Sequence, residues 1–127
     1  MYKYQKYMHY FNKWMENREH GLWIADYLKK QGSPSVSVYG CGILGRHLIW
    51  ELNNKNYPVM WIMDKSDSHE QYEVNGLKDI NTVKKVNLVI VTAMADYEDV
   101  EMFICAHDVG RPISLEELIN IIHGGVK

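Results

Sequence analysis

The feature that most constrains this chain is a glycine motif, G-x-G-x-x-G, directly after a short apolar run. The apolar run at residues 36–39 predicts a buried strand, and residues 44–52 predict a helix after the motif. Gly40 allows a tight turn off the strand, Gly42 leaves room for a phosphate, and Gly45 lets helix and strand pack closely. The free N–H groups and the dipole at the start of the helix favour negative charge. The motif therefore predicts the phosphate-binding turn of a dinucleotide-binding fold.

A second apolar run, at residues 59–63, ends in Asp64, about 20 residues after the glycines, as in dinucleotide-binding folds. An acid at that place accepts hydrogen bonds from the adenosine ribose hydroxyls. Its charge would repel the 2′-phosphate of NADP, although Lys65 would offset part of the repulsion. We therefore expect NAD, ahead of NADP or a sugar nucleotide. The alternative is a tight strand–helix turn that binds no ligand, with Asp64 an exposed acid.

The remaining apolar runs alternate with helical segments, which is typical of a parallel sheet with helices on both faces. We expect a Rossmann-like three-layer α/β/α domain at residues 34–127, with about five parallel strands in the order 3-2-1-4-5. The ligand crevice would lie at the carboxyl ends of strands 1 and 4. Beyond those named above, the expected strands are 72–74, 88–92 and 112–114, and the expected helices are 80–85, 97–107 and 115–122, the last with a capping box from Ser114 to Glu117.

Residues 1–33 form a helical preface to this domain, which Gly21 divides into two helices. The first helix carries an aromatic stripe at helical spacing, made of Tyr4, Tyr7, Phe11 and Trp14. The stripe has two interpretations. It packs the helix on its own sheet, or it forms the interface of a twofold homodimer, because aromatic side chains are enriched at interface centres.

Composition excludes several classes of function. The chain has 127 residues, 46% hydrophobic and 24% charged, with a net charge of −2. It is long enough for one domain with a sizeable core. There is no basic surplus to indicate nucleic acid, and no apolar run of about 20 residues to span a membrane. The N-terminus does not resemble a signal peptide and there are only two cysteines, so we expect a cytoplasmic protein.

Side chains for chemistry are sparse in the sequence. The histidines show no metal-ligand spacing, so no metal site is expected. Cys41, between two glycines of the motif, is interpreted as a small filler residue, and Cys105 is expected in the core. No general base stands out, and the sequence leaves open whether the protein is an enzyme.

Four segments together resemble a group of small bacterial NAD(P)-binding Rossmann modules. The segments are residues 38–45, 61–65, 88–92 and 112–118. Such modules accompany nucleotide-sugar and capsular-polysaccharide biosynthesis enzymes. The resemblance implies that Gly40, Gly42 and Gly45 hold phosphate, that Asp64 holds the ribose, and that the residues after the fourth strand border the cofactor. The full set of expected cofactor-binding residues is Gly40, Cys41, Gly42, Ile43, Leu44, Gly45, Asp64, Lys65, Thr92 and Ala93.

These observations leave three functional hypotheses. The first is an accessory, NAD-binding module in sugar-nucleotide or surface-polysaccharide metabolism. The second is a small NAD-dependent oxidoreductase whose active site is completed by dimerisation. The third is a domain that binds S-adenosylmethionine, because a glycine loop and a second-strand acid also suit that cofactor.

Overall fold

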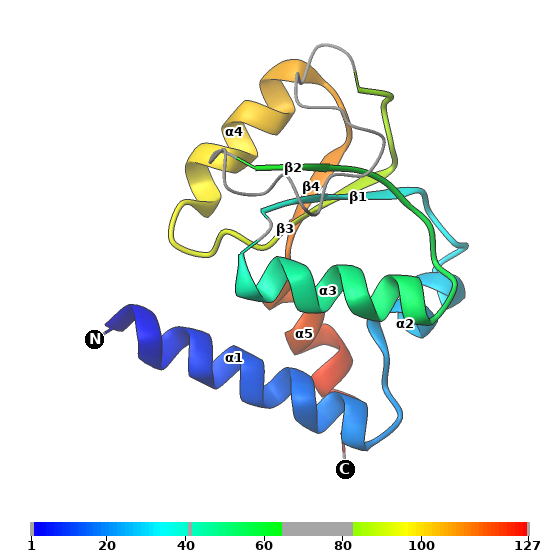
Figure 1. The fold of residues 1–127 in the computed structure, drawn as a ribbon, viewed down its shortest axis with the longest axis vertical. Helices are drawn as coiled ribbons and strands as arrows, with labels where there is room; N and C mark the ends of the chain where they lie inside the picture. Colours follow the sequence, from blue (N-terminus) through cyan, green and yellow to red (C-terminus); the bar gives the residue numbers. More distant parts are fainter. Residues whose placement is uncertain (1, 41, 65–82, 127) are drawn as a thin grey trace.

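The structure, a computed structural model, describes residues 2–40, 42–64 and 83–126 (Figure 1). After two initial helices, helices and parallel strands alternate over these residues, except that β3 is the next described element after β2. The elements in chain order are α1 (Tyr2–Glu19), α2 (Ile24–Lys30), β1 (Val36–Tyr39), α3 (Ile43–Asn54), β2 (Val59–Met63), β3 (Leu88–Val91), α4 (Tyr97–His107), β4 (Arg111–Ser114) and α5 (Leu115–His123).

The described strands form one parallel sheet in the order β2-β1-β3-β4. β1 and β3 are the central strands, and every residue in both is buried. Such continuous burial explains why both strands are apolar apart from Ser37, because helices cover both faces of the sheet. The predicted α/β class with a parallel sheet is confirmed. The strand predicted at residues 72–74 lies outside the described residues, so the five-stranded order 3-2-1-4-5 stays a prediction.

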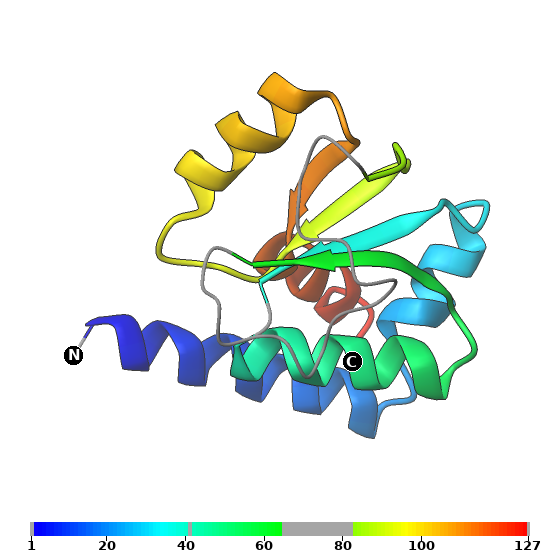
Figure 2. The ribbon, with the colours of Figure 1, turned by 45° about the horizontal axis from the view of Figure 1, so that its top comes forward.

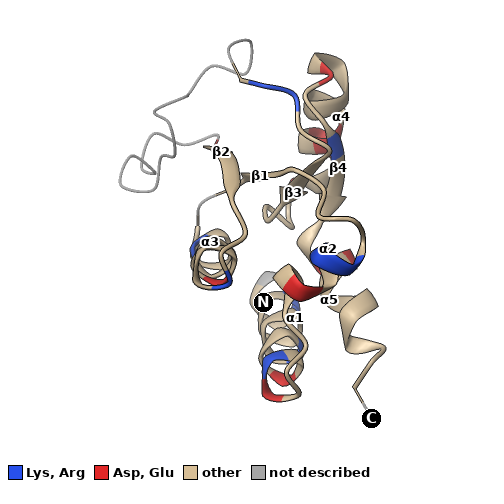
Figure 3. Cartoon of the chain, turned by 90° about the vertical axis from the view of Figure 1, so that its right-hand side faces the viewer, with Lys and Arg blue, Asp and Glu red and all other residues tan. Residues whose placement is uncertain are grey.

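The helices are divided between the two faces of the sheet. α3 and α5 pack on one face and α4 packs on the other (Figure 2). Side chains alternate along β1 and β3 accordingly, with Val38 and Ile90 in the cluster under α3 and α5, and Tyr39 and Val91 in the cluster under α4. α1 forms a further layer beneath α3 and α5, on their side away from the strands (Figure 3).

A buried carboxylate fastens α1 and α2 to α3. Glu51 of α3 is 0% exposed. Its Oε1 accepts hydrogen bonds of 2.9 Å from Trp14 Nε1 and from Arg18 Nε, and its Oε2 accepts one of 2.6 Å from the Ile24 backbone N–H. The ion pair with Arg18 and the two other donors compensate the cost of burying the charge. α1 therefore packs within its own chain, as one of the two interpretations predicts, but it lies on α3 and α5 and not directly on the strands.

Several sequence-based expectations can be compared with the elements. The helix over 97–107 is confirmed, and the Ser114 hydroxyl accepts a 3.0 Å hydrogen bond from the Glu117 backbone N–H, as expected of a cap. The helix predicted at 80–85 is wrong over its described part, since residues 83–86 are not helical; residues 80–82 lie outside the described residues. Cys105 was expected in the core, but it is exposed on α4, where Ile104 is the buried neighbour.

Candidate functional site

The glycine loop joins the carboxyl end of β1 to the start of α3, between β2 and β3. Gly40 has a φ of +107°, which side-chain-bearing residues rarely adopt. Its N–H donates a 2.7 Å hydrogen bond to the Met63 carbonyl of β2, and the Thr92 N–H donates one of 3.0 Å to the Tyr39 carbonyl. The loop is thus held from both neighbouring strands.

Thr92, directly after β3, fixes the shape of this loop. Its side chain is buried, and its Oγ1 donates a 3.0 Å hydrogen bond to the Gly40 carbonyl oxygen. A Cβ added to Gly40 would collide with the same hydroxyl. Thr92 is therefore a positioning residue for the loop as well as part of the site edge predicted from the sequence.

The other two glycines of the motif differ in their surroundings. A Cβ on Gly45 would overlap the Gly40 carbonyl group, so α3 touches the loop at this point, as the sequence predicts for the third glycine. Gly42, the residue before α3, has an ordinary φ of −72° and no atom within 4 Å of an added Cβ. It faces open space at the N-terminus of α3, where the backbone N–H groups favour an anion.

A cavity of about 570 Å³ opens above this loop, within the 300–1,000 Å³ range of small-molecule sites. It brings together eight of the ten residues predicted to bind a cofactor, from the ends of β1, β2 and β3 and the first turn of α3. Cys41 and Lys65 lie outside the described residues. The eight are Gly40, Gly42, Ile43, Leu44, Gly45, Asp64, Thr92 and Ala93.

The opposite wall of the cavity comes from α1, through Tyr4, Tyr7, Met8 and Phe11. These positions follow the i, i+3, i+4, i+7 spacing of one helix face. The sequence predicts that the aromatic stripe packs the helix or forms a subunit interface, and it does not predict that the stripe lines this cavity. The sequence shows that this face is apolar, but it does not show that the face stays exposed before Trp14, the buried residue of the same stripe.

The cavity carries little charge. Among the described residues that line it, only Asp64 has a side chain that is charged at neutral pH. Burial, and then the negative charges of Asp64 and Asp96, raise the pKa of the Tyr39 phenol above its ordinary value, so Tyr39 stays neutral. With no lysine or arginine among these lining residues, a bound phosphate would depend on the N–H groups of α3.

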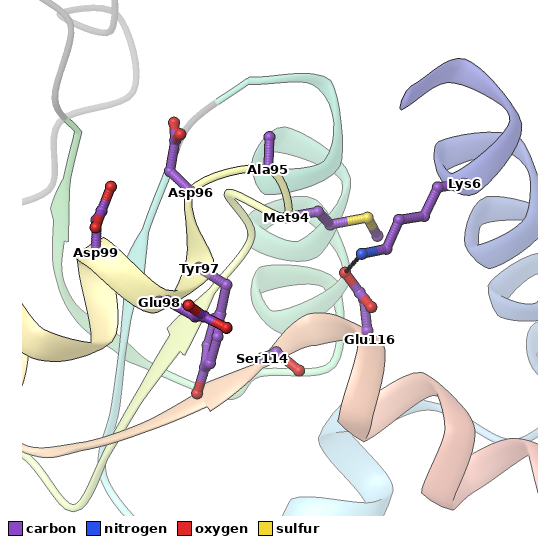
Figure 4. Close-up of a pocket in the computed structure, with 9 residues that line it drawn as sticks. All are labelled: Lys6, Met94, Ala95, Asp96, Tyr97, Glu98, Asp99, Ser114 and Glu116. Atoms are coloured by element: carbon purple, nitrogen blue, oxygen red, sulfur yellow. Dashed lines mark ion pairs between the residues drawn. The ribbon is translucent and has the colours of Figure 1, made fainter. Parts of the chain in front are cut away.

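A second, smaller cavity of about 370 Å³ lies at the ends of β3 and β4 (Figure 4). It too is bordered by α1, through Lys6, whose Nζ lies 3.3 Å from Glu116 Oε1 at the start of α5. Its other lining residues are Met94, Ala95, Asp96, Tyr97, Glu98, Asp99 and Ser114. Burial, and then the hydrogen bond to Glu101, raise the pKa of Tyr97 to about 12, so its phenol is a neutral group at physiological pH.

Two kinds of site are not found among the described residues. No three or more histidine, cysteine or acidic side chains in residues 2–40, 42–64 and 83–126 come together to hold a metal ion. None of the helices in the same ranges is both long and apolar enough to cross a membrane.

No known protein family matches the chain, and comparisons with curated proteins and with solved structures find no significant match.

Proposed function

We propose that this protein binds a dinucleotide of the NAD type in the cavity above the glycine loop. The observation that carries the proposal is that one cavity joins Gly42 at the open N-terminus of α3 to Asp64 at the end of β2. The pyrophosphate would lie on the N–H groups of α3, and the Asp64 carboxylate would accept hydrogen bonds from the adenosine ribose. The same carboxylate would disfavour the 2′-phosphate of NADP.

We assign the protein an accessory, non-catalytic role. The described residues that line the cavity include no histidine, cysteine or lysine to act as a general base or nucleophile. An oxidoreductase would need such groups from elsewhere, for example from a second subunit. The link to sugar-nucleotide or surface-polysaccharide metabolism is supported by the sequence resemblance alone.

S-adenosylmethionine is the second candidate ligand. Its sulfonium group is positively charged, and the only charge among the described lining residues is the carboxylate of Asp64. The two candidates differ in their phosphates. ADP-ribose should compete with a dinucleotide for the site, and it should not compete with the methyl donor.

The first test is a thermal-shift titration with NAD, NADP, ADP-ribose and S-adenosylmethionine. Gly42→Asp is the blocking variant. The added Cβ meets open space, and aspartate is a good residue before a helix, so the variant should fold. Its carboxylate would occupy the N–H groups that the pyrophosphate needs. Gln31→Asp is the matched control, because it adds the same charge at an exposed position before β1.

NAD should stabilise the wild type and Gln31→Asp by about 2.7 kcal/mol at a hundredfold excess over its dissociation constant. It should not stabilise Gly42→Asp. The proposal fails if no nucleotide shifts the wild type, or if Gly42→Asp responds to NAD as the wild type does. A shift by S-adenosylmethionine that ADP-ribose leaves unchanged would support the second candidate instead.

A further inference from the structure

We infer that α1 forms one wall of the ligand site. The dinucleotide has two nucleosides, and the ring of the nucleoside that lacks adenine lies against Tyr4 and Met8 of this wall. This inference rests on the proposed function and extends it, because it assigns a ligand contact to a helix outside the Rossmann-like unit. Three observations support it: the position of α1 along the carboxyl ends of the strands, the exposure of its apolar side chains, and their lack of charge.

The position of α1 sets which half of the ligand it meets. The carboxyl ends of the strands follow one another in the order β2, β1, β3 and β4. Asp64 marks the β2 side as the adenosine half, and a dinucleotide crosses the glycine loop from there toward the other strands. α1 lies toward that other side, since it packs along α5 and its Lys6 pairs with Glu116 directly after β4. In Figures 1 and 2 the N-terminal end of α1 lies on the side where α3 begins.

The surface that α1 presents to the cavity is apolar and exposed. Tyr4 is 74% exposed, Met8 is 67% exposed, and Ile43 on the facing first turn of α3 is 66% exposed. All three line the same cavity as the glycine loop. A flat ring between α1 and α3 would cover these side chains, because aromatic rings and methionine sulfur both pack well on a ring face.

The charge of the wall also fits this part of the ligand. Lys6, a cation of α1, lines the neighbouring cavity and forms an ion pair with Glu116. Among the described residues, the α1 side of the cavity therefore offers a phosphate no cation, only the hydroxyl groups of Tyr4 and Tyr7. The oxidised nicotinamide ring carries a positive charge on an otherwise apolar plane, and the faces of tyrosine rings attract such cations.

The test compares NAD with ADP-ribose, which lacks the second ring, by titration calorimetry on the full chain. The variant is the double substitution Tyr4→Ala with Met8→Ala, whose side chains are largely exposed and contribute little to the core. Met102→Ala is the matched control, because Met102 is 70% exposed on α4, on the other face of the sheet. Circular dichroism melting checks that all variants fold as the wild type does.

The double variant should bind NAD about tenfold more weakly, which corresponds to about 1.4 kcal/mol, and should bind ADP-ribose as the wild type does. Tyr4→Phe with Met8 retained should bind NAD as the wild type does, since the ring is kept. The inference is overturned if the double variant binds NAD normally. It is also overturned if the double variant loses affinity for NAD and for ADP-ribose equally, because that result would place the adenosine half against α1. If the wild type binds neither ligand, the proposed function itself fails.

Discussion

The glycines of the loop meet different constraints, although one motif contains them all. Gly40 is required by its positive φ and by the Thr92 hydroxyl beside it. Gly45 is required by the contact between α3 and the Gly40 carbonyl. Gly42 has neither constraint. The fold itself does not need a glycine at position 42. If glycine is needed there, the need comes from a bound ligand, and for this reason binding is tested at Gly42.

Gly45→Ala should destabilise the protein. The new methyl group would overlap the Gly40 carbonyl and force α3 away from the loop, and overpacking of this kind costs about 1–3 kcal/mol. Gly42→Ser is the matched control, because serine suits the position before a helix and its side chain meets open space; its effect should stay within about 0.5 kcal/mol. Urea unfolding followed by circular dichroism measures both. Equal midpoints for Gly45→Ala and the wild type would contradict the close contact seen here.

At the scale of elements, the packing contact between α1 and α3, called the joint below, is built from polar as well as apolar side chains. Glu51 collects donors from α1 and α2, while the Arg18 guanidinium lies 5.0 Å from the Trp14 ring centre and 5.4 Å from that of Trp50. One turn before Glu51, the His47 ring lies 5.4 Å from Phe11, centre to centre. The joint orients the whole of α1, and so it also orients the wall of the cavity.

The joint should weaken in mild acid. Burial, and then the positive charges of Arg18 and Arg46, lower the pKa of His47 below its ordinary value of 6.5. The folded protein thus favours neutral His47, and the unfolded chain binds a proton more readily. Stability from this group is fully present above pH 6.5 and is lost as the pH falls through the lowered pKa.

We expect the free energy of unfolding of the wild type to fall between about pH 7 and pH 5, and His47→Gln to reduce that slope. Urea denaturation over this range measures the effect. His9→Gln, at an exposed position on α1, is the control and should keep the wild-type slope. A His47→Gln variant with an unchanged slope would show that His47 does not report on the joint.

At the scale of the whole molecule, α1 contributes to the same hydrophobic core as the sheet and its covering helices. Trp14 is 1% exposed within the larger of the two hydrophobic clusters, and Tyr7 and Phe11 pack against that cluster. Changing Tyr7 and Phe11 would therefore disturb the fold as well as any contact between subunits. The homodimer expected from the sequence remains a prediction, and the more exposed Tyr4 and Met8 are the better places to test it.

Deletion of residues 1–20 should abolish cooperative folding. It would remove Trp14 from the core and leave buried Glu51 without two of its three donors, a change that costs about 3–5 kcal/mol for a broken buried ion pair alone. Thermal melting by circular dichroism and binding of a hydrophobic dye would show the loss. The Tyr4→Ala, Met8→Ala variant is the control, because it alters the same helix without touching its buried face. A sharp melting transition in the deleted chain would show that the remaining layers suffice.

The sequence by itself determined the parts of this protein that depend on local rules. Residues 59–63 and 88–91 are unbroken apolar runs, and residues 36–39 are apolar apart from Ser37. The turn at Gly40 needs a positive φ, so strands, helices and glycine loop follow from periodicity and turn chemistry. The tertiary structure decided which side of each helix is buried. Trp14 and Tyr4 lie on one stripe, yet only Trp14 is buried, and Cys105 is exposed beside buried Ile104. Such differences depend on where distant helices cross, and no local pattern records this; for that reason the wall that α1 adds to the cavity is visible only in the folded chain.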